Sequence, residues 1–200
     1  MIRTSFRLPL LLLVGAFSLS ACAGGVLVGG AATVGVAAVQ ERSVGAAVDD
    51  ATIEFKIKDK FIELSDKLFT RVSVDSVEGR VLLSGTVDTP DERVDVARMT
   101  WQVDGVKEVF NEVEVRDRGG LIDYFKDVRI ANELRLKLLT DSKISAVNYS
   151  VETVNGVIFL MGVAQDQPEL ERVTGHASNI KGVERVVSFV VLKDDPRRGS

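Results

Sequence analysis

The sequence predicts an α+β fold in which two α-β-β-α-β modules follow each other, each with a small mixed three-stranded sheet and two helices on one face of it. An internal repeat is the first observation behind this prediction. When the chain is shifted by 77 positions, the glycines at 79, 85 and 105 fall on those at 156, 162 and 182 without a gap. The second observation is that the hydrophobic spacing changes in the same order in both copies, from helical to alternating and back. Each copy is close to the smallest size that folds alone, so we expect the two to stabilise each other by packing together.

Composition and the repeat divide the chain into six predicted segments. These are a signal peptide (1–21), a Gly/Ala/Val-rich tether (22–49), the first module (50–116), a linker (117–126), the second module (127–193) and a tail (194–200). The tether has a GxxxG spacing at Gly25 and Gly29, which can bring two helices together in a membrane. Its many glycines disfavour a helix in water, so a tether along the membrane or over the folded part is the preferred interpretation.

The N-terminal segment has the order of a bacterial export signal that ends at a cysteine. Arg3 and Arg7 precede an apolar run from Leu8 to Leu19, which is too short to anchor a protein across a bilayer. Small residues then lead to Cys22, the only cysteine in the chain. This order resembles the lipoprotein signal, which implies that Cys22 becomes the first residue and carries acyl chains such as palmitate. Ala23 in place of an aspartate implies the outer membrane, and the alternative is a secreted protein with an unmodified cysteine.

The first helix and the hairpin of each module are predicted from local patterns. In the first copy Ile53, Ile57, Phe61 and Leu64 recur at helical spacing. Two alternating strands follow, joined by Glu78-Gly79 in the first copy and by Asn155-Gly156 in the second. Asn-Gly favours a tight hairpin because both residues tolerate positive φ.

The second helix of each module begins with a capping signal. Thr89-Pro90 is followed by Glu92, and Asp166 and Glu169 stand at the same offsets in the second copy. We therefore expect these acidic residues to cap helices rather than to act as catalytic carboxylates. The residues expected to be buried on this helix are Val96, Thr100 and Val103 in one copy, and Leu170, Val173, Ala177 and Ile180 in the other.

A third strand follows the second helix, after Gly105 in one copy and Gly182 in the other. Because a strand-helix-strand crossover joins parallel strands with a right-handed turn, this strand is expected beside the second strand and parallel to it. The helices then cover one face of the sheet and leave the other free for a partner. Binding is therefore expected on surfaces rather than in a deep cleft.

Charge and residue types exclude several classes of function. Two of the 25 Lys and Arg lie in the leader, so 23 basic residues face 29 acidic ones and the formal charge after cleavage is −6. This balance argues against nucleic-acid binding and predicts that any affinity for anionic lipid is local. His176 is the only histidine and is expected to be structural. With no phosphate-binding loop, metal motif or catalytic triad, we expect no enzyme, no cofactor and no metal.

The run Gly79 to Val87, followed by a helix and then by Gly105 to Val113, resembles a BON domain, and Gly156 to Val190 resembles a second one. The resemblance covers essentially all of residues 50–193. Two such domains behind a lipoprotein signal imply a role in envelope integrity. They also imply binding of anionic phospholipid through the first helix of the second domain.

The candidate lipid-binding residues lie where that helix begins. They are Tyr124, Phe125, Lys126, Arg129, Arg135 and Lys137. Aromatic side chains suit the headgroup boundary, and Lys and Arg can meet lipid phosphates at about 1 kcal/mol each. Ile130, Leu134 and Leu138 are expected to be plain core, and packing of Tyr124 and Phe125 between the domains is an equal alternative to lipid contact.

Two hypotheses follow for the function. The first is an outer-membrane lipoprotein, facing the periplasm, whose second BON domain binds phosphatidylglycerol or cardiolipin. The second is a periplasmic adaptor that contacts envelope-assembly or peptidoglycan-remodelling proteins through its exposed sheet faces. In that case the acyl chains on Cys22 supply all the membrane affinity.

Overall fold

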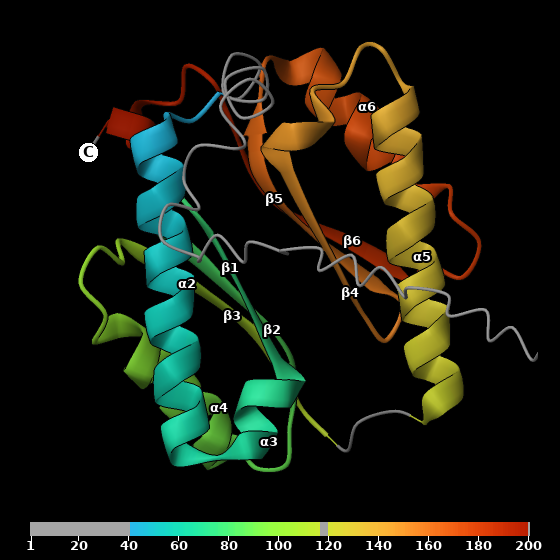
Figure 1. Ribbon diagram of the computed structural model, residues 1–200. Coiled ribbons are helices and arrows are strands. Elements are labelled where there is room, and N and C mark those ends of the chain that lie inside the picture. The colour runs from blue at the N-terminus through green and yellow to red at the C-terminus, as the bar shows by residue number, and fades with distance from the viewer. Residues whose placement is uncertain (1–40, 117–119, 200) are drawn as a thin grey trace, which may run out of the picture.

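Two copies of one fold follow each other along the chain, and they pack together through their sheets (Figure 1). The structure is a computed structural model that describes residues 41–116 and 120–199. The predicted leader, Cys22 and most of the tether therefore lie outside the described residues.

The first copy contains three helices and three strands in the described residues. They are α2 (Val44–Leu64), α3 (Asp66–Arg71), β1 (Val72–Val77), β2 (Arg80–Val87), α4 (Pro90–Trp101) and β3 (Glu108–Val115). The second copy contains α5 (Leu121–Thr140), the 3₁₀ turn η1 (Ala146–Asn148), β4 (Tyr149–Val154), β5 (Val157–Ala164), α6 (Gln167–Ser178), β6 (Arg185–Leu192) and the 3₁₀ turn η2 (Pro196–Gly199). Apart from α3, each helix and strand of the first copy recurs 77 positions later, within one residue at its ends. Helix α2 begins inside the segment predicted as tether, and α5 begins inside the one predicted as linker.

Each sheet has the predicted mixed topology. The strand orders are β1-β2-β3 and β4-β5-β6, with the first pair antiparallel and the second pair parallel in both sheets. Tight turns join the antiparallel pairs, with positive φ at Glu78 and Gly79 in one copy and at Asn155 and Gly156 in the other. The α+β prediction with a central second strand is therefore confirmed.

Each copy has its own hydrophobic core, which lies between its sheet and its helices. In the first copy Ile53, Ile57 and Phe61 on α2 are buried against the sheet, and in the second copy Ile130 and its neighbours on α5 are buried likewise. Leu64 departs from the prediction, because it is the last residue of α2 and is exposed. On the second helix of the second copy, Leu170 is half-buried while Val173 is fully buried.

The remaining faces of the two sheets pack against each other, which corrects the prediction that they are free for a partner. The third core contains residues from both copies: Val77 and Leu82 from the first, and Val157, Phe159, Met161, Val163 and Val191 from the second. The Phe110 and Phe189 rings stack across this contact with centroids 4.2 Å apart. Because the central strands are buried along their whole length, both of their faces need cover, and each copy covers the other.

The acidic capping residues stand where the sequence places them. Thr89 and Glu92 form a complete capping box at the start of α4. Asp166 accepts from the Glu169 amide at the start of α6, and the Glu169 carboxylate accepts from the Ser145 and Gln165 amides. These carboxylates stabilise helix starts and loops rather than form a reactive site.

The two ends of the described chain meet beside the start of α2 (Figure 1). Arg198 Nη2 donates to the Glu41 carbonyl at 2.9 Å and lies 2.8 Å from the Glu78 carboxylate. The Glu41 carboxylate lies 3.0 Å from Lys193 Nζ. Within residues 41–116 and 120–199, no helix is long and apolar enough to cross a membrane.

Candidate functional site

Helix α5 presents two apolar faces, one to the core and one to solvent. Ile130, Leu134 and Leu138 are buried against the second sheet, as the sequence predicted. On the other side five apolar side chains are exposed: Ile122, Phe125, Val128, Leu136 and Leu139. Phe125 is 65% exposed and Leu139 is 70% exposed, although both are large apolar side chains. We call these five residues the α5 stripe.

Basic side chains border the α5 stripe on the side of the loop between α6 and β6. A methyl group built on Gly182 would lie 3.4 Å from Arg129 Nη2 and 3.4 Å from Lys126 Cε, so both cations lie over this loop. Arg129 donates to the Lys181 carbonyl at 2.5 Å. Lys181 is itself exposed, so this loop carries a third basic residue close in the fold to Lys126 and Arg129.

Arg129 and Lys137 both lie near the carboxylate of Glu133, which is one turn after Arg129 and one turn before Lys137 on α5. Glu133 lies 3.0 Å from Arg129 Nη1 and 3.9 Å from Lys137 Nζ. Both pairs are partly exposed, so they hold the side chains only weakly and water screens them. The two cations remain able to face an external anion.

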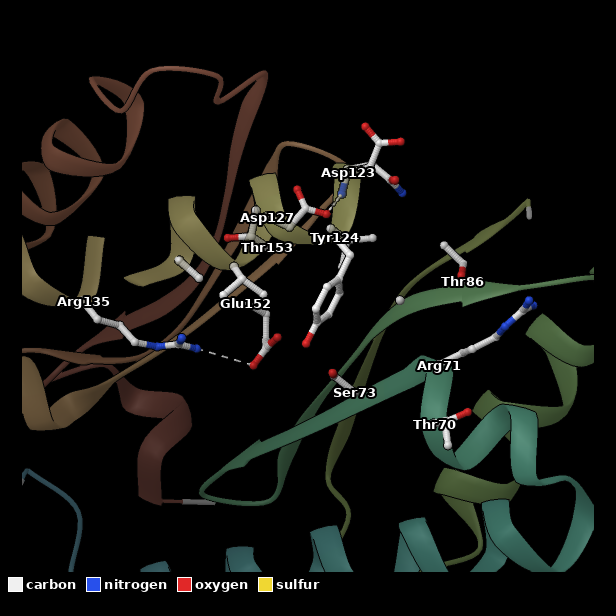
Figure 2. Close-up of a pocket in the computed structure, with 15 residues that line it drawn as sticks. Thr70, Arg71, Ser73, Thr86, Asp123, Tyr124, Asp127, Arg135, Glu152 and Thr153 are labelled. Atoms are coloured by element: carbon white, nitrogen blue, oxygen red, sulfur yellow. Dashed lines mark hydrogen bonds and ion pairs between the residues drawn. The ribbon is translucent and has the colours of Figure 1, made fainter. Parts of the chain in front are cut away.

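Arg135 and Tyr124 lie on the opposite flank of α5, at a cleft between the two copies (Figure 2). The cleft has a volume of about 330 Å³, and its other wall includes Arg71 and Ser73 of the first copy. Tyr124 points into it, and Phe125 meets the Tyr124 ring edge-on at 5.7 Å between centroids. Of the two aromatics predicted either to bind lipid or to pack between the domains, Tyr124 takes the interdomain place and Phe125 stays exposed.

Arg135 is held inside the cleft by the second sheet. Its guanidinium donates to the Val151 carbonyl and lies 3.8 Å from the Glu152 carboxylate. Burial and, to a lesser degree, the nearby Asp75 carboxylate raise the pKa of Glu152 to about 7, against the opposing effect of Arg135. Arg135 is therefore engaged within the protein, in contrast to the basic group at Lys126.

The structure thus divides the six predicted residues between two places. Phe125, Lys126, Arg129 and Lys137 lie on or beside the α5 stripe, whereas Tyr124 and Arg135 lie at the cleft. Sequence reasoning missed the exposed Leu136 and Leu139, although their spacing from Phe125 continues one side of the helix and was visible in the sequence. Lys181 is distant in sequence, and no local pattern connects it to α5.

The single histidine contacts the aspartate that ends α5. His176 Nε2 is 2.9 Å from Asp141 Oδ2, and Arg172 is 3.5 Å from the same oxygen. The His176 contact is the largest influence that lowers the pKa of Asp141. Within residues 41–116 and 120–199, no group of three or more His, Cys, Asp or Glu side chains is placed to hold a metal ion.

The BON domain model matches the chain twice, over residues 49–117 and 126–194. The chain belongs to the BON family. Its two BON domains account for both sheets, and the α5 stripe lies on the first helix of the second BON domain.

Three relatives resemble the chain over most of its length. The chain is 41% identical over 152 residues to an "Uncharacterized protein in gshII 5'region" of Anaplasma centrale, covering 76% of this chain and 99% of that one. It is 32% identical over 187 residues to the "Outer membrane lipoprotein DolP" of Haemophilus influenzae, covering 92% and 96%. It is 29% identical over 154 residues to the "Osmotically-inducible protein Y" of Escherichia coli, covering 76% and 77%.

The first BON domain lacks the basic group at the equivalent place. Asp49 and Thr52 stand on α2 where Lys126 and Arg129 stand on α5, 77 positions later. Helix α2 also exposes an apolar side chain, Phe55, which is 71% exposed. The two domains therefore share exposed apolar surface on their first helices, but their cations stand at different positions, Lys126 and Arg129 in the second domain and Lys56 and Lys107 in the first.

Proposed function

We propose that this protein is a non-enzymatic outer-membrane lipoprotein, facing the periplasm, whose second BON domain binds anionic phospholipid and so supports envelope integrity. Phosphatidylglycerol and cardiolipin are the lipids with the required charge. The observation that carries the proposal is the α5 stripe, an exposed apolar strip bordered by Lys126, Arg129 and Lys181.

Both parts of this surface suit the boundary of a bilayer. The side chains of Phe125, Leu136 and Leu139 gain free energy by leaving water for the acyl boundary, at about 25 cal/mol per Å² of apolar surface. Each Lys or Arg near an anionic membrane adds about 1 kcal/mol, and the effect decays within a Debye length. Because the protein's overall charge is negative, this local group determines which lipids attract it.

If Cys22 carries acyl chains, a weak affinity of α5 for lipid would be enough to keep α5 on the membrane. Acyl chains that hold the protein on a membrane convert contact by α5 into an intramolecular event with a high effective concentration. The similarity to an outer membrane lipoprotein over 92% of the chain supports this location. Binding through α5 would then concentrate the protein where anionic lipid gathers.

A periplasmic adaptor is the second candidate, and a different surface now favours it. The sheet faces are covered, but Val94 and Trp101 on α4 are 64% and 54% exposed and lie seven residues apart on one side of the helix. Glu171 and Ser178 occupy the equivalent positions of α6. An exposed tryptophan in one domain alone suits a protein contact, which crosslinking from position 94 in intact cells would detect.

The test of the first proposal is co-sedimentation of the chain from residue 22, kept unacylated by Cys22→Ser, with vesicles. Phosphatidylglycerol-containing vesicles should bind it at low salt, and phosphatidylcholine vesicles should not. We expect the double variant Phe125→Ser, Arg129→Gln to bind at least tenfold more weakly, because it removes one apolar and one basic contact.

The matched control is Phe55→Ser, which removes an equally exposed phenylalanine from the first helix of the other domain. It should leave vesicle binding unchanged. Equal binding by the parent protein and the double variant would remove α5 as the lipid site. Binding to neither vesicle would give the adaptor first place.

A further inference from the structure

The contact between the two BON domains brings equivalent residues of the repeat face to face. Asp75 on β1 and Glu152 on β4 are separated by the repeat length of 77, and so are Lys58 on α2 and Arg135 on α5. A contact between two copies of one fold places residues near its axis opposite their own equivalents, as in a symmetric dimer. Ser150, two residues before Glu152 on β4, donates to the Asp75 carboxylate across this contact, so the two carboxylates are neighbours there.

The two carboxylates have different partners: Asp75 is hydrogen-bonded to the opposite domain, whereas Glu152 contacts a cation of its own domain. Ser150 Oγ of the second domain donates to the Asp75 carboxylate of the first. Glu152 lies 3.8 Å from the Arg135 guanidinium, which also donates to the Val151 carbonyl. Asp75 therefore has the better support for its charge, and Glu152 is the member that takes up a proton.

The cations near the pair are partly occupied by backbone carbonyls. Lys58 Nζ donates to the Phe69 carbonyl at 2.6 Å and to the Val72 carbonyl at 2.6 Å. The charged and titratable groups that face the pair are Lys58 and Glu54 on α2, Arg135 on α5, and Tyr124, Asp123, Asp127 and Arg71 around the cleft. Besides the pair, this set contains as many carboxylates as cations. The cations therefore do not neutralise the pair when both of its members are ionised.

We propose that the contact between the BON domains is proton-responsive, so that protonation of Glu152 beside Asp75 tightens the packing of the two sheets and its ionisation loosens it. The chemistry is protonation of one of two neighbouring carboxylates at a domain interface, and no ligand is involved. The inference does not depend on lipid binding.

The direction of the effect follows from where the proton is bound. Burial raises the pKa of Glu152 to about 7 and raises the pKa of Asp75 above its usual range. In the unfolded chain the pKa of a glutamate is close to 4.5. Between these values the packed form binds more protons than the unfolded form, so stability rises as pH falls from about 7 towards 4.5.

His176 lies 2.9 Å from the Asp141 carboxylate, and imidazole side chains as a class change charge near neutrality. Measurements are therefore made on the chain from residue 22 with Cys22→Ser and His176→Gln, so that the histidine contributes nothing. Glutamate residues labelled with ¹³C at the side-chain carboxyl allow direct titration by NMR.

We expect the Glu152 carboxyl signal to titrate with a midpoint near 7 and the melting temperature to be about 2–5 °C higher at pH 6 than at pH 8. The Glu152 side chain is 30% exposed, so water screens part of the repulsion and the shift is kept to a few degrees. A midpoint between 4 and 5 for Glu152 would overturn the proposal without any further variant.

Three variants test whether Glu152 and Asp75 cause the difference in melting temperature between pH 6 and pH 8. Glu152→Gln should abolish the difference between pH 6 and pH 8, whereas Glu63→Gln, which changes an exposed glutamate at the end of α2, should retain it. Asp75→Asn should lower the Glu152 midpoint because it removes the facing charge. A pH difference that survives in Glu152→Gln would contradict the inference.

Discussion

The two BON domains have the same backbone and the same core, yet the outward sides of their first helices differ. Core positions such as Ile57 and Leu134 are equivalent and fully buried in both domains. On the outward side, Asp49 and Thr52 in the first domain stand where Lys126 and Arg129 stand in the second. Burial constrains the core of both copies equally, while the solvent side can change without cost to the fold. A repeated fold can in this way keep one structural copy and adapt the other.

The same comparison holds for the aspartate that fixes each hairpin turn. Asp50 on α2 accepts from the Glu78 and Gly79 amides, and Asp127 on α5 accepts from the Asn155 and Gly156 amides. Asp50 is also hydrogen-bonded to Ser76 and lies 3.1 Å from Arg42, and it is almost fully buried. The helix-to-turn connection is thus stronger in the first domain.

Replacing the two aspartates should have the largest effect of the changes considered. Asp50→Ala removes a buried carboxylate from the partly exposed Arg42 and from two turn amides, so we expect a loss of about 3–5 kcal/mol in unfolding free energy. Asp127→Ala removes two amide partners at a less buried place and should cost about 1–2 kcal/mol. Urea unfolding followed by circular dichroism measures both losses. Equal losses would show that the helix-to-turn connection stabilises both domains to the same extent.

The contrast also shows what the sequence could and could not predict. Periodicity, capping boxes and the gapless repeat were enough for both BON folds, because each of these signals is local. Asp50 and Asp127 gave no local signal, since their partners lie 28 and 29 residues away. The covering of the sheets was missed because alternation indicates that a face is apolar and not what covers it. Arg135 was assigned to lipid because its partner Glu152 lies 17 residues away on β4, and only the folded second domain shows that the two side chains meet.

Exchanging the charges on the two first helices tests whether they alone distinguish the domains. Lys126→Asp with Arg129→Thr gives α5 the residues of α2 and should weaken binding to phosphatidylglycerol vesicles by about 2 kcal/mol, or roughly 30-fold. Asp49→Lys with Thr52→Arg in that background should restore part of the affinity, because Phe55 supplies exposed apolar surface nearby. Co-sedimentation measures both. No recovery would mean that the shape of the α5 stripe, and not charge alone, determines binding.

A smaller effect is expected where the domains meet through aromatic rings. Phe110 and Phe189 stack at 4.2 Å, so a double-mutant cycle to alanine should give a coupling of about 1 kcal/mol in unfolding free energy. Phe110 and Phe55 serve as the control pair, since Phe55 is exposed on α2 and should give additive losses. Additivity for Phe110 with Phe189 would indicate that the two domains unfold without support from each other across this contact.

The smallest expected effect links the interdomain carboxylates to the lipid surface. Protonation of Glu152 removes one negative charge beside Arg135, so the flank of α5 becomes more positive as pH falls through about 7. At constant salt, and with the imidazole removed by His176→Gln, binding to phosphatidylglycerol vesicles should strengthen about twofold to fivefold between pH 8 and pH 6. Glu152→Gln should bind at pH 8 as the parent binds at pH 6, and Glu63→Gln should behave like the parent. If Glu152→Gln kept the full pH dependence, the two domains would respond to protons and to lipid independently, because the carboxylate pair would then have no influence on the charge of α5.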